Sequence, residues 1–278
     1  GSEMCIRDRF NGTSNFILSK MTHEQTTFKD ALEEAQRLGF AEADPTDDVE
    51  GVDAARKVVI TSYLSFNQVI KLNDVKLVGI SDITLADINA ASALNYKIKL
   101  IGKGTYENGY VNASVEPTLI HKNHQLAAVE NEYNAIYVIG DAVGDTMFYG
   151  KGAGSLATGS AVVSDLLNVA LFFESNLHTL PPHFELKTEE TKEMMDGAEP
   201  VVIQEKSNYY IVISHSHKSL EKVEYDIKKK LPFHKSLQLV ERDQDTYAII
   251  VTGIETSPEK VLNQSGFNVK KVYPVEGV

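Results

Sequence analysis

The order of predicted strands and helices in residues 208–278 constrains the fold of this chain more than any other feature. Apolar, β-branched runs alternate there with stretches of helical periodicity. The pattern predicts a strand, a helix, two strands, a helix and a strand at residues 209–214, 220–231, 236–240, 247–252, 258–264 and 269–275. This βαββαβ order is the ferredoxin-like arrangement.

A linker at 181–207 separates this region from an earlier domain at 10–180, because it holds Pro181-Pro182, a charged run and Gly197 and has little periodicity. The earlier domain predicts helices at 27–38, 47–66, 85–94 and 156–173, and strands at 75–80, 96–106, 110–117, 135–139 and 145–149. An Asn-Gly pair at 108–109 favours a tight hairpin turn. Residues 1–9 show no periodicity and are interpreted as a tag or an artefactual segment outside the fold.

Charge and cysteine content exclude several classes of protein. The chain has 39 acidic against 27 basic residues, a net charge of −12, whereas nucleic-acid binding needs a dense basic face. The single cysteine, Cys5, excludes a disulfide framework and multi-cysteine zinc sites, and we expect no metal. No run approaches the roughly 18 apolar residues of a membrane span, and the N-terminus lacks the apolar region of a signal peptide. We therefore expect a cytoplasmic protein without membrane contact.

The acidic stretch at 42–57 is the first candidate for chemistry. Asp53 and Lys57 lie four residues apart on a predicted helix, so they share one face and can pair. A lysine held by a carboxylate and partly desolvated can act as a proton donor or acceptor. The same spacing also fits a surface ion pair on a capped helix. The stretch does not match the alternating oxygen ligands and central glycine of an EF-hand loop.

A glycine loop at Gly152-Ala153-Gly154 is the second candidate. It matches G-x-G-x-x-A, follows a predicted strand and opens a helix, as a dinucleotide fingerprint does. However, no buried apolar strand follows that helix, so a complete nucleotide-binding half cannot be built there. The glycines can let the backbone approach a cofactor held by another domain, or they can simply form a tight turn between strand and helix.

Several motifs in succession resemble the homoserine dehydrogenase family. They are Asn-Gly-Thr-Ser-Asn-Phe-Ile-Leu at 11–18, the segments 39–45 and 48–57, and Tyr-Gly-Lys-Gly-Ala-Gly at 149–154 followed by Asp165. The resemblance covers about residues 10–173. Residues 208–278 resemble an ACT regulatory domain, as in long bacterial members of the family. The expected fold class is α+β: a substrate-binding and dimerisation domain with a mainly antiparallel sheet and flanking helices, followed by the ferredoxin-like ACT domain.

The resemblance implies a role for each matching residue. Lys57 is expected to protonate the carbonyl oxygen, and Asp53 to hold Lys57 and the reacting oxygen. Glu42 is expected to bind the substrate ammonium group, and Asp48 to support substrate placement. Residues Gly152, Ala153 and Gly154 are expected at the nicotinamide end of NAD or NADP.

This sequence departs from the family pattern at three places. The family's N-terminal Rossmann domain, which holds most of the cofactor, is not recognised in this sequence. The residues that would distinguish NAD from NADP belong to that domain, so the sequence does not predict which of the two is used. Lys151 stands where the family usually has proline. The first turn of the ACT-like domain, residues 214–219, holds His215 and His217 and lacks the usual glycine, which predicts weak or absent threonine binding.

The expected function is therefore that of a homoserine dehydrogenase fragment. The family interconverts L-aspartate 4-semialdehyde and L-homoserine with NAD(P) on the path to threonine, methionine and isoleucine, and we expect a homodimer that is inactive without its cofactor domain. An alternative is a non-catalytic regulatory or assembly module that kept the fold. A semialdehyde dehydrogenase acting through a thiohemiacetal would need a cysteine, and the chain has only Cys5.

Overall fold

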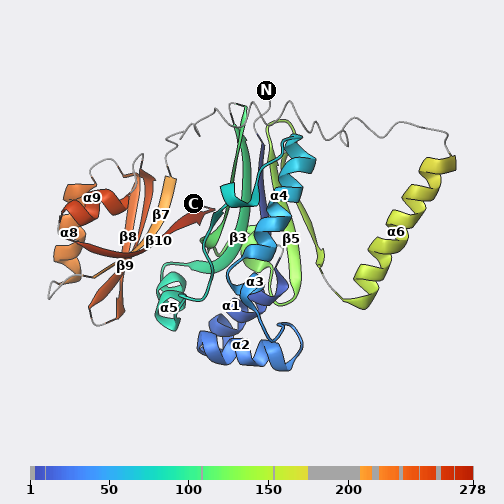
Figure 1. Ribbon diagram of the computed structural model, residues 1–278. Coiled ribbons are helices and arrows are strands. Elements are labelled where there is room, and N and C mark those ends of the chain that lie inside the picture. Colours follow the sequence, from blue (N-terminus) through green and yellow to red (C-terminus); the bar gives the residue numbers. More distant parts are fainter. Residues whose placement is uncertain are drawn as a thin grey trace.

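The computed structural model places two packed regions on one continuous sheet (Figure 1). The structure describes residues 4–9, 11–107, 109–152, 154–174, 207–214, 219–231, 234–243, 245–254, 258–265 and 267–277. Among these residues the strands follow the order β6-β5-β1-β3-β4-β10-β7-β9-β8, and β2 pairs with β4 beside this path. The sheet is mostly antiparallel, which agrees with the predicted α+β class.

The first region combines long strands with helices. Its strands are β1 (Met4–Arg9), β2 (Lys76–Leu77), β3 (Tyr96–Glu107), β4 (Tyr110–His121), β5 (Tyr133–Gly140) and β6 (Gly144–Lys151). Its helices are α1 (Gly12–Glu24), α2 (Phe28–Arg37), α3 (Thr46–Val49), α4 (Val52–Phe66), α5 (Leu85–Ala93) and α6 (Ser155–Glu174), with 3-10 turns η1 (Leu72–Asp74) and η2 (Gln125–Ala128). Helices α1, α4 and α5 lie against one face of the sheet and share its hydrophobic core.

The predicted hairpin is confirmed. β3 and β4 pair antiparallel along their whole length, from Tyr96 opposite His121 to Glu107 opposite Tyr110. Gly109 in the turn has a φ of 89°, which glycine adopts without steric cost. Both outer edges of the hairpin are partly paired: β1 pairs with residues 102–106 of β3, and β2 and the end of β10 each pair with two residues of β4.

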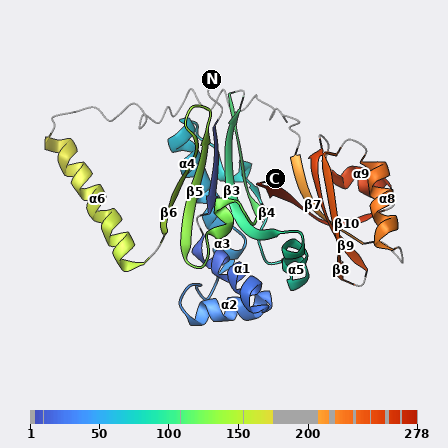
Figure 2. The same cartoon turned by 180° about the vertical axis from the view of Figure 1, so that it is seen from behind.

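The second region has the predicted βαββαβ order. It runs β7 (Ser207–Ser214), α8 (Leu220–Lys230), β8 (Ser236–Asp243), β9 (Thr246–Ile254), α9 (Pro258–Gln264) and β10 (Asn268–Glu276). The strand order β10-β7-β9-β8 completes the ferredoxin-like arrangement. Helices α8 and α9 cover one face of this sheet, and α5 of the first region lies against the other (Figures 1 and 2).

Four local expectations need correction. The single helix predicted over 47–66 is two helices, because Gly51 takes a φ of 80° between α3 and α4. The strand predicted at 75–80 shortens to β2. Helix α1 was not predicted, since its buried positions include Thr13, Ser14 and Asn15 as well as apolar residues. Leaving residues 1–9 out of the fold is wrong for Met4–Arg9, which form β1 between β3 and β5 with Ile6 buried.

Helix α6 stands apart from the sheet in both views (Figures 1 and 2). Residues 155–173 have a mean hydropathy of 1.6 and none of that stretch is buried, so by length and composition alone this helix could cross a membrane. The expectation that no apolar run approaches such a length is therefore wrong for this segment.

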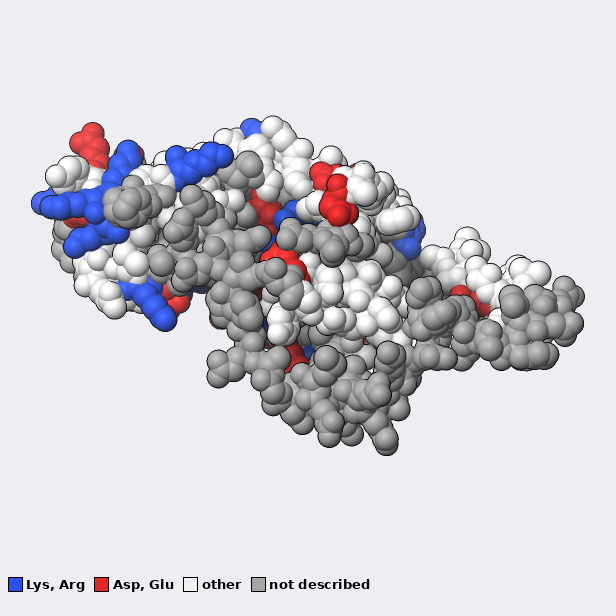
Figure 3. Space-filling view, turned by 90° about the horizontal axis from the view of Figure 1, so that it is seen from above, with Lys and Arg blue, Asp and Glu red and all other residues white. Residues whose placement is uncertain are grey.

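Basic side chains gather at the end of the molecule formed by the second region (Figure 3). Helix α8 ends there in Lys228, Lys229 and Lys230.

Candidate active site

The polar centre of the first region is built on the N-terminus of α1. Asn11 is 5% exposed and caps this helix, because its side-chain oxygen accepts a hydrogen bond from the Ser14 N–H at 2.7 Å. The other end of the same amide donates to Asp48 Oδ1 at 2.7 Å and to Asp53 Oδ2 at 3.1 Å. One buried asparagine thus holds together two acids from the α3–α4 corner.

Gly51 makes that corner possible. Its φ of 80° ends α3 and starts α4, so Asp48 and Asp53 approach the same amide from two helices. A Cβ on Gly51 would lie 3.0 Å from Val115 Cγ1, tighter than ordinary van der Waals contact. Glycine is therefore required here by both backbone conformation and packing.

Lys57 completes the chain of contacts. Its Nζ lies 2.7 Å from Asp53 Oδ2, the same oxygen that accepts from Asn11. The Lys57 and Asp53 side chains are 42% and 31% exposed, so this ion pair is reached by solvent. A charged amine that is held in place and still accessible suits proton transfer to a bound molecule.

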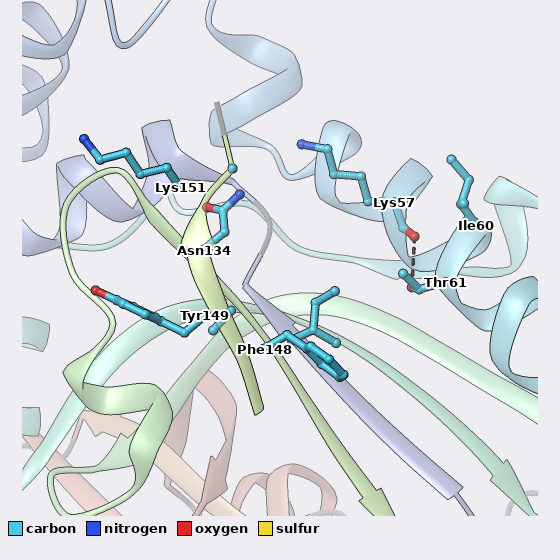
Figure 4. Close-up of a pocket in the computed structure, with 11 residues that line it drawn as sticks. Lys57, Ile60, Thr61, Asn134, Phe148, Tyr149 and Lys151 are labelled. Atoms are coloured by element: carbon cyan, nitrogen blue, oxygen red, sulfur yellow. Dashed lines mark hydrogen bonds between the residues drawn. The ribbon is translucent and has the colours of Figure 1, made fainter. Parts of the chain in front are cut away.

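A cavity of about 440 Å³ opens beside Lys57. Its lining includes Lys57, Ile60 and Thr61 on α4, and Figure 4 shows these residues across from Asn134 of β5 and Phe148 of β6. Lys57 approaches the cavity from α4 and Phe148 from β6, whereas the side chains of Tyr149 and Lys151 extend to the other side of β6, where Tyr149 stacks on Tyr133. The cavity therefore offers the Lys57 amine and an apolar surface to a ligand, as small-molecule sites commonly do.

The predicted glycine loop lies at the edge of this cavity. Gly152 lines it, and a Cβ built there would overlap the Asn134 side chain. Gly154 has a φ of 114°, a conformation that other residues rarely adopt. Ala153 lies outside the described residues. The glycines at 152 and 154 thus serve close packing and the turn into α6.

Glu42 lies on an exposed loop that is hydrogen-bonded to the N-terminal end of α1. Thr13, two residues after Asn11, donates from Oγ1 to the Phe40 carbonyl at 2.6 Å. Gln36 donates to the Glu42 carbonyl at 3.0 Å, and the rings of Phe16 and Phe40 lie 4.8 Å apart. The structure therefore brings Asp48, Asp53 and Lys57 together directly, and fixes the backbone that carries Glu42 to the same helix.

Sequence reasoning missed the part played by Asn11 and the cavity walls. Asn11 belongs to the 11–18 motif, and because an asparagine directly before a helix is a recognisable cap, this position could have been identified from the sequence. Lys151 was noted only as a departure, and it forms an ion pair with Glu132 at 3.2 Å and lies 5.7 Å from the centre of the Tyr133 ring. Within the described part of the chain, no group of three or more His, Cys, Asp or Glu side chains is arranged to hold a metal ion.

Comparison with known proteins agrees with this arrangement. The sequence model of the family described as homoserine dehydrogenase matches residues 5–167, and the model described as homoserine dehydrogenase C-terminal domain matches 206–278. The chain belongs to the homoserine dehydrogenase family. The C-terminal region thus matches a domain defined within this family.

Individual relatives support the assignment. The homoserine dehydrogenase of Bacillus subtilis is 55% identical over 159 residues, which are 57% of this chain and 37% of that protein. The crystal structure of S. aureus homoserine dehydrogenase at pH 7.5 is 69% identical, has a TM-score of 0.87 and covers 100% of this chain and 66% of its own. That of Thiobacillus denitrificans is 33% identical, with a TM-score of 0.80, over 99% of this chain and 64% of its own. The chain spans less than two thirds of the length of each of these relatives.

Proposed function

We propose that this chain carries the substrate-binding part of a homoserine dehydrogenase, which interconverts L-aspartate 4-semialdehyde and L-homoserine with NAD or NADP. The observation that carries the proposal is the Asp53–Lys57 pair at 2.7 Å, fixed by Asn11 and open to the cavity. The chemistry of the substrate fits, because a reacting carbonyl needs a proton donor and a free ammonium group needs a carboxylate.

The cavity suits the nicotinamide end of the cofactor. Gly152 brings the backbone close to the Asn134 side chain at the cavity edge, and Phe148 offers flat apolar surface. When bound, the reduced cofactor supplies a hydride to the carbonyl carbon of the semialdehyde. The choice between NAD and NADP stays open, since no described contact bears on it.

The residues of this chain handle the proton. As the new C–H bond forms, the electron pair of the C=O double bond moves onto oxygen, and Lys57 gives its proton there to form the hydroxyl group. Asp53 accepts a hydrogen bond from the lysine and holds its amine in place, while Asn11 keeps Asp53 and Asp48 from moving apart. A positioned cation is most favourable when negative charge builds on the oxygen in the transition state.

Glu42 is proposed to bind the substrate ammonium group, and Asp48 to support substrate placement. Glu42 is exposed on a loop anchored through Phe40, so its carboxylate is accessible to a ligand. This contact acts equally in the ground state and the transition state. Its loss should therefore raise KM more than it lowers kcat.

The test joins this chain to the portion of the S. aureus enzyme that the match leaves uncovered. Oxidation of NADPH with aspartate 4-semialdehyde is expected from the joined protein, and Glu42→Gln is expected to raise KM for the semialdehyde at least about tenfold with kcat nearly kept. A folded joined protein that binds NADPH but shows no turnover would favour the alternative, a non-catalytic regulatory or assembly module. The 278-residue chain assayed alone is expected to show no turnover.

We infer that the C-terminal region is an ACT-like regulatory domain with weak or no affinity for threonine. Its ferredoxin-like topology supports this, while residues 215–218 of the first turn, with His215 and His217, lie outside the described residues. Calorimetry should use the whole chain, because an excised domain would lose α5 from its sheet. No saturable heat is expected at millimolar threonine, and a micromolar Kd would contradict the inference.

We propose a homodimer through the first region and a cytoplasmic location. Because β1, β2 and β10 already pair with parts of both edges of the β3–β4 hairpin, we propose that the second copy packs against a face of this sheet. On that face a cavity of about 310 Å³ is lined by Lys103, Asn112, Ser114 and Glu116 among other polar residues. Light scattering at micromolar concentration should give twice the monomer mass, and a monomer mass would contradict the dimer.

A further inference from the structure

Asp87 is a fully buried carboxylate in the first turn of α5. It forms a capping box with Thr84, whose N–H and Oγ1 donate to Asp87 Oδ2 at 3.0 and 2.8 Å. A capping box is common at an exposed helix start. Here, however, the carboxylate has an exposed fraction of zero, so a local capping role does not account for its burial.

Two cations from the C-terminal region meet this carboxylate. Arg242 of β8 donates from Nε to Asp87 Oδ1 at 2.9 Å, and Lys271 of β10 donates to Asp87 Oδ2 at 2.7 Å. Their side chains are only 11% and 18% exposed. Arg242 also donates to Thr84 Oγ1 at 2.9 Å, and Lys271 to the Asp82 carbonyl. The start of α5 is thus tied to two strands that lie far ahead in the sequence.

Apolar packing surrounds this ion cluster. The face of the C-terminal sheet that α5 covers includes the buried Tyr210, Val212, Ala248, Ile250 and Tyr273. These residues belong to the same hydrophobic core as Ile88 of α5 and the residues under α1. The opposite face of the sheet is filled by α8 and α9. Without α5, the C-terminal sheet would expose an apolar face to water.

The contact between α5 and the C-terminal sheet depends on the negative charge of Asp87. Burial works against ionisation of the carboxyl group, but the hydrogen bonds from Arg242 and Lys271 outweigh it and keep its pKa below the usual value. Removal of the negative charge would take away the carboxylate that Lys271 contacts at 2.7 Å, while Arg242 would keep its ion pair with Asp243. The nearby Tyr210 hydroxyl is buried and has no hydrogen-bond partner among the described residues.

We propose that Asp87 docks the C-terminal domain onto α5 and, through α5, is a positioning residue for the site on α1. Helix α5 packs against both α1 and β8, and α1 carries Asn11, which holds Asp48 and Asp53. The C-terminal domain is therefore part of the core that supports the site. The effect on catalysis rests on the proposed function, whereas the docking does not.

Hydrogen–deuterium exchange on the 278-residue chain tests the docking, with Asp87→Asn compared with Asp30→Asn. Asp30 is a matched control because it also occupies the first turn of a helix and accepts from a capping threonine, Thr27 at 2.7 Å, but it is exposed. Asp87→Asn is expected to speed amide exchange in α5, β8 and β10 at least about tenfold, with a smaller increase in α1. Exchange equal to that of Asp30→Asn in these elements would overturn the proposal.

If Asp87→Asn does not fold, Lys271→Gln gives a milder test, because Arg242 then still pairs with Asp87. It is expected to speed exchange in the same elements by a smaller factor, and unchanged exchange would count equally against the proposal. In the enzyme joined to a cofactor-binding portion, Asp87→Asn should lower kcat about threefold to tenfold with KM nearly kept, while Asp87→Glu should recover part of the loss. An unchanged kcat alongside faster exchange would overturn the positioning role and leave the assignment of Lys57 intact.

Discussion

Two ion clusters in this molecule have the same contact distance and opposite surroundings. Lys57 lies 2.7 Å from Asp53, and Lys271 lies 2.7 Å from Asp87. The first pair is 42% and 31% exposed, whereas the second is 18% and 0% exposed. Water screens the first pair, so it contributes little to folding and its amine can reach a ligand. The second pair has lost its hydration, so each charge depends on the other and the cluster joins two domains.

If the Asp53–Lys57 pair serves catalysis, replacement of Lys57 should give the largest loss of kcat. Lys57→Ala in the joined enzyme is expected to lower kcat by ~10²–10⁴-fold with a modest change in KM, because the proton donor acts in the transition state. Steady-state kinetics measure this. Lys228→Ala is the matched control, since Lys228 pairs with Glu224 at 2.6 Å with the same spacing and is 52% exposed. A Lys57→Ala enzyme within threefold of the parent kcat would remove Lys57 from the mechanism.

Acid should weaken the buried cluster in a defined pH range. The pKa of Asp87 is lowered in the folded protein, so its stabilisation is present above the unfolded pKa of about 3.9 and is lost as pH falls through the folded pKa. At pH 7 Asp87→Asn is expected to cost ~3–5 kcal/mol. Urea unfolding of both proteins from pH 7 down to pH 3 should show this difference shrinking below about pH 4. A difference that is constant across this range would show that the charge of Asp87 is not what matters.

Asn11 belongs to the exposed cluster although it is itself buried, so its removal should affect both folding and kinetics. Asn11→Ala is expected to lower the free energy of unfolding by ~1–2 kcal/mol through the lost helix cap. Thr27→Ala removes the cap of α2 away from the site and should give a similar or smaller loss. Of these two variants, Asn11→Ala should also change kcat and KM, because Asn11, unlike Thr27, hydrogen-bonds to Asp48 and Asp53. Equal kinetics for the two variants would show that Asn11 acts only as a cap.

The smallest change in the free energy of unfolding is expected for Asp53→Asn, and it tests most directly whether the two ion pairs differ in their surroundings. Asp53→Asn is expected to change the free energy of unfolding by only ~0.3–0.5 kcal/mol, the value of an exposed pair with this helical spacing. Glu224→Gln in the Lys228 pair should give a similar value by urea unfolding. A loss above about 2 kcal/mol for Asp53→Asn would show that the Asp53–Lys57 pair contributes to folding as a buried ion pair does, and would contradict the comparison.

Local structure followed from local signals in the sequence. Thr27 caps α2, Thr84 caps α5, and Gly109 closes the β3–β4 hairpin, as their residue types and positions predict. The βαββαβ order of the C-terminal region also follows, because each strand or helix has its own apolar period. Such signals depend on neighbours within a few residues. The spacing of Asp53 and Lys57 belongs to the same class, and it predicted their contact.

The contacts that give these elements their roles were decided by the tertiary structure. Asn11 is 37 residues from Asp48, and Asp87 is 155 residues from Arg242, so no local pattern relates them. Thr84 and Asp87 have the spacing of an ordinary capping box, and this local pattern carries no information about burial. It is buried because the apolar face of the C-terminal sheet must be covered, and α5 covers it. Burial then removes water from three charges, and their mutual pairing becomes the interaction that fixes the two domains together.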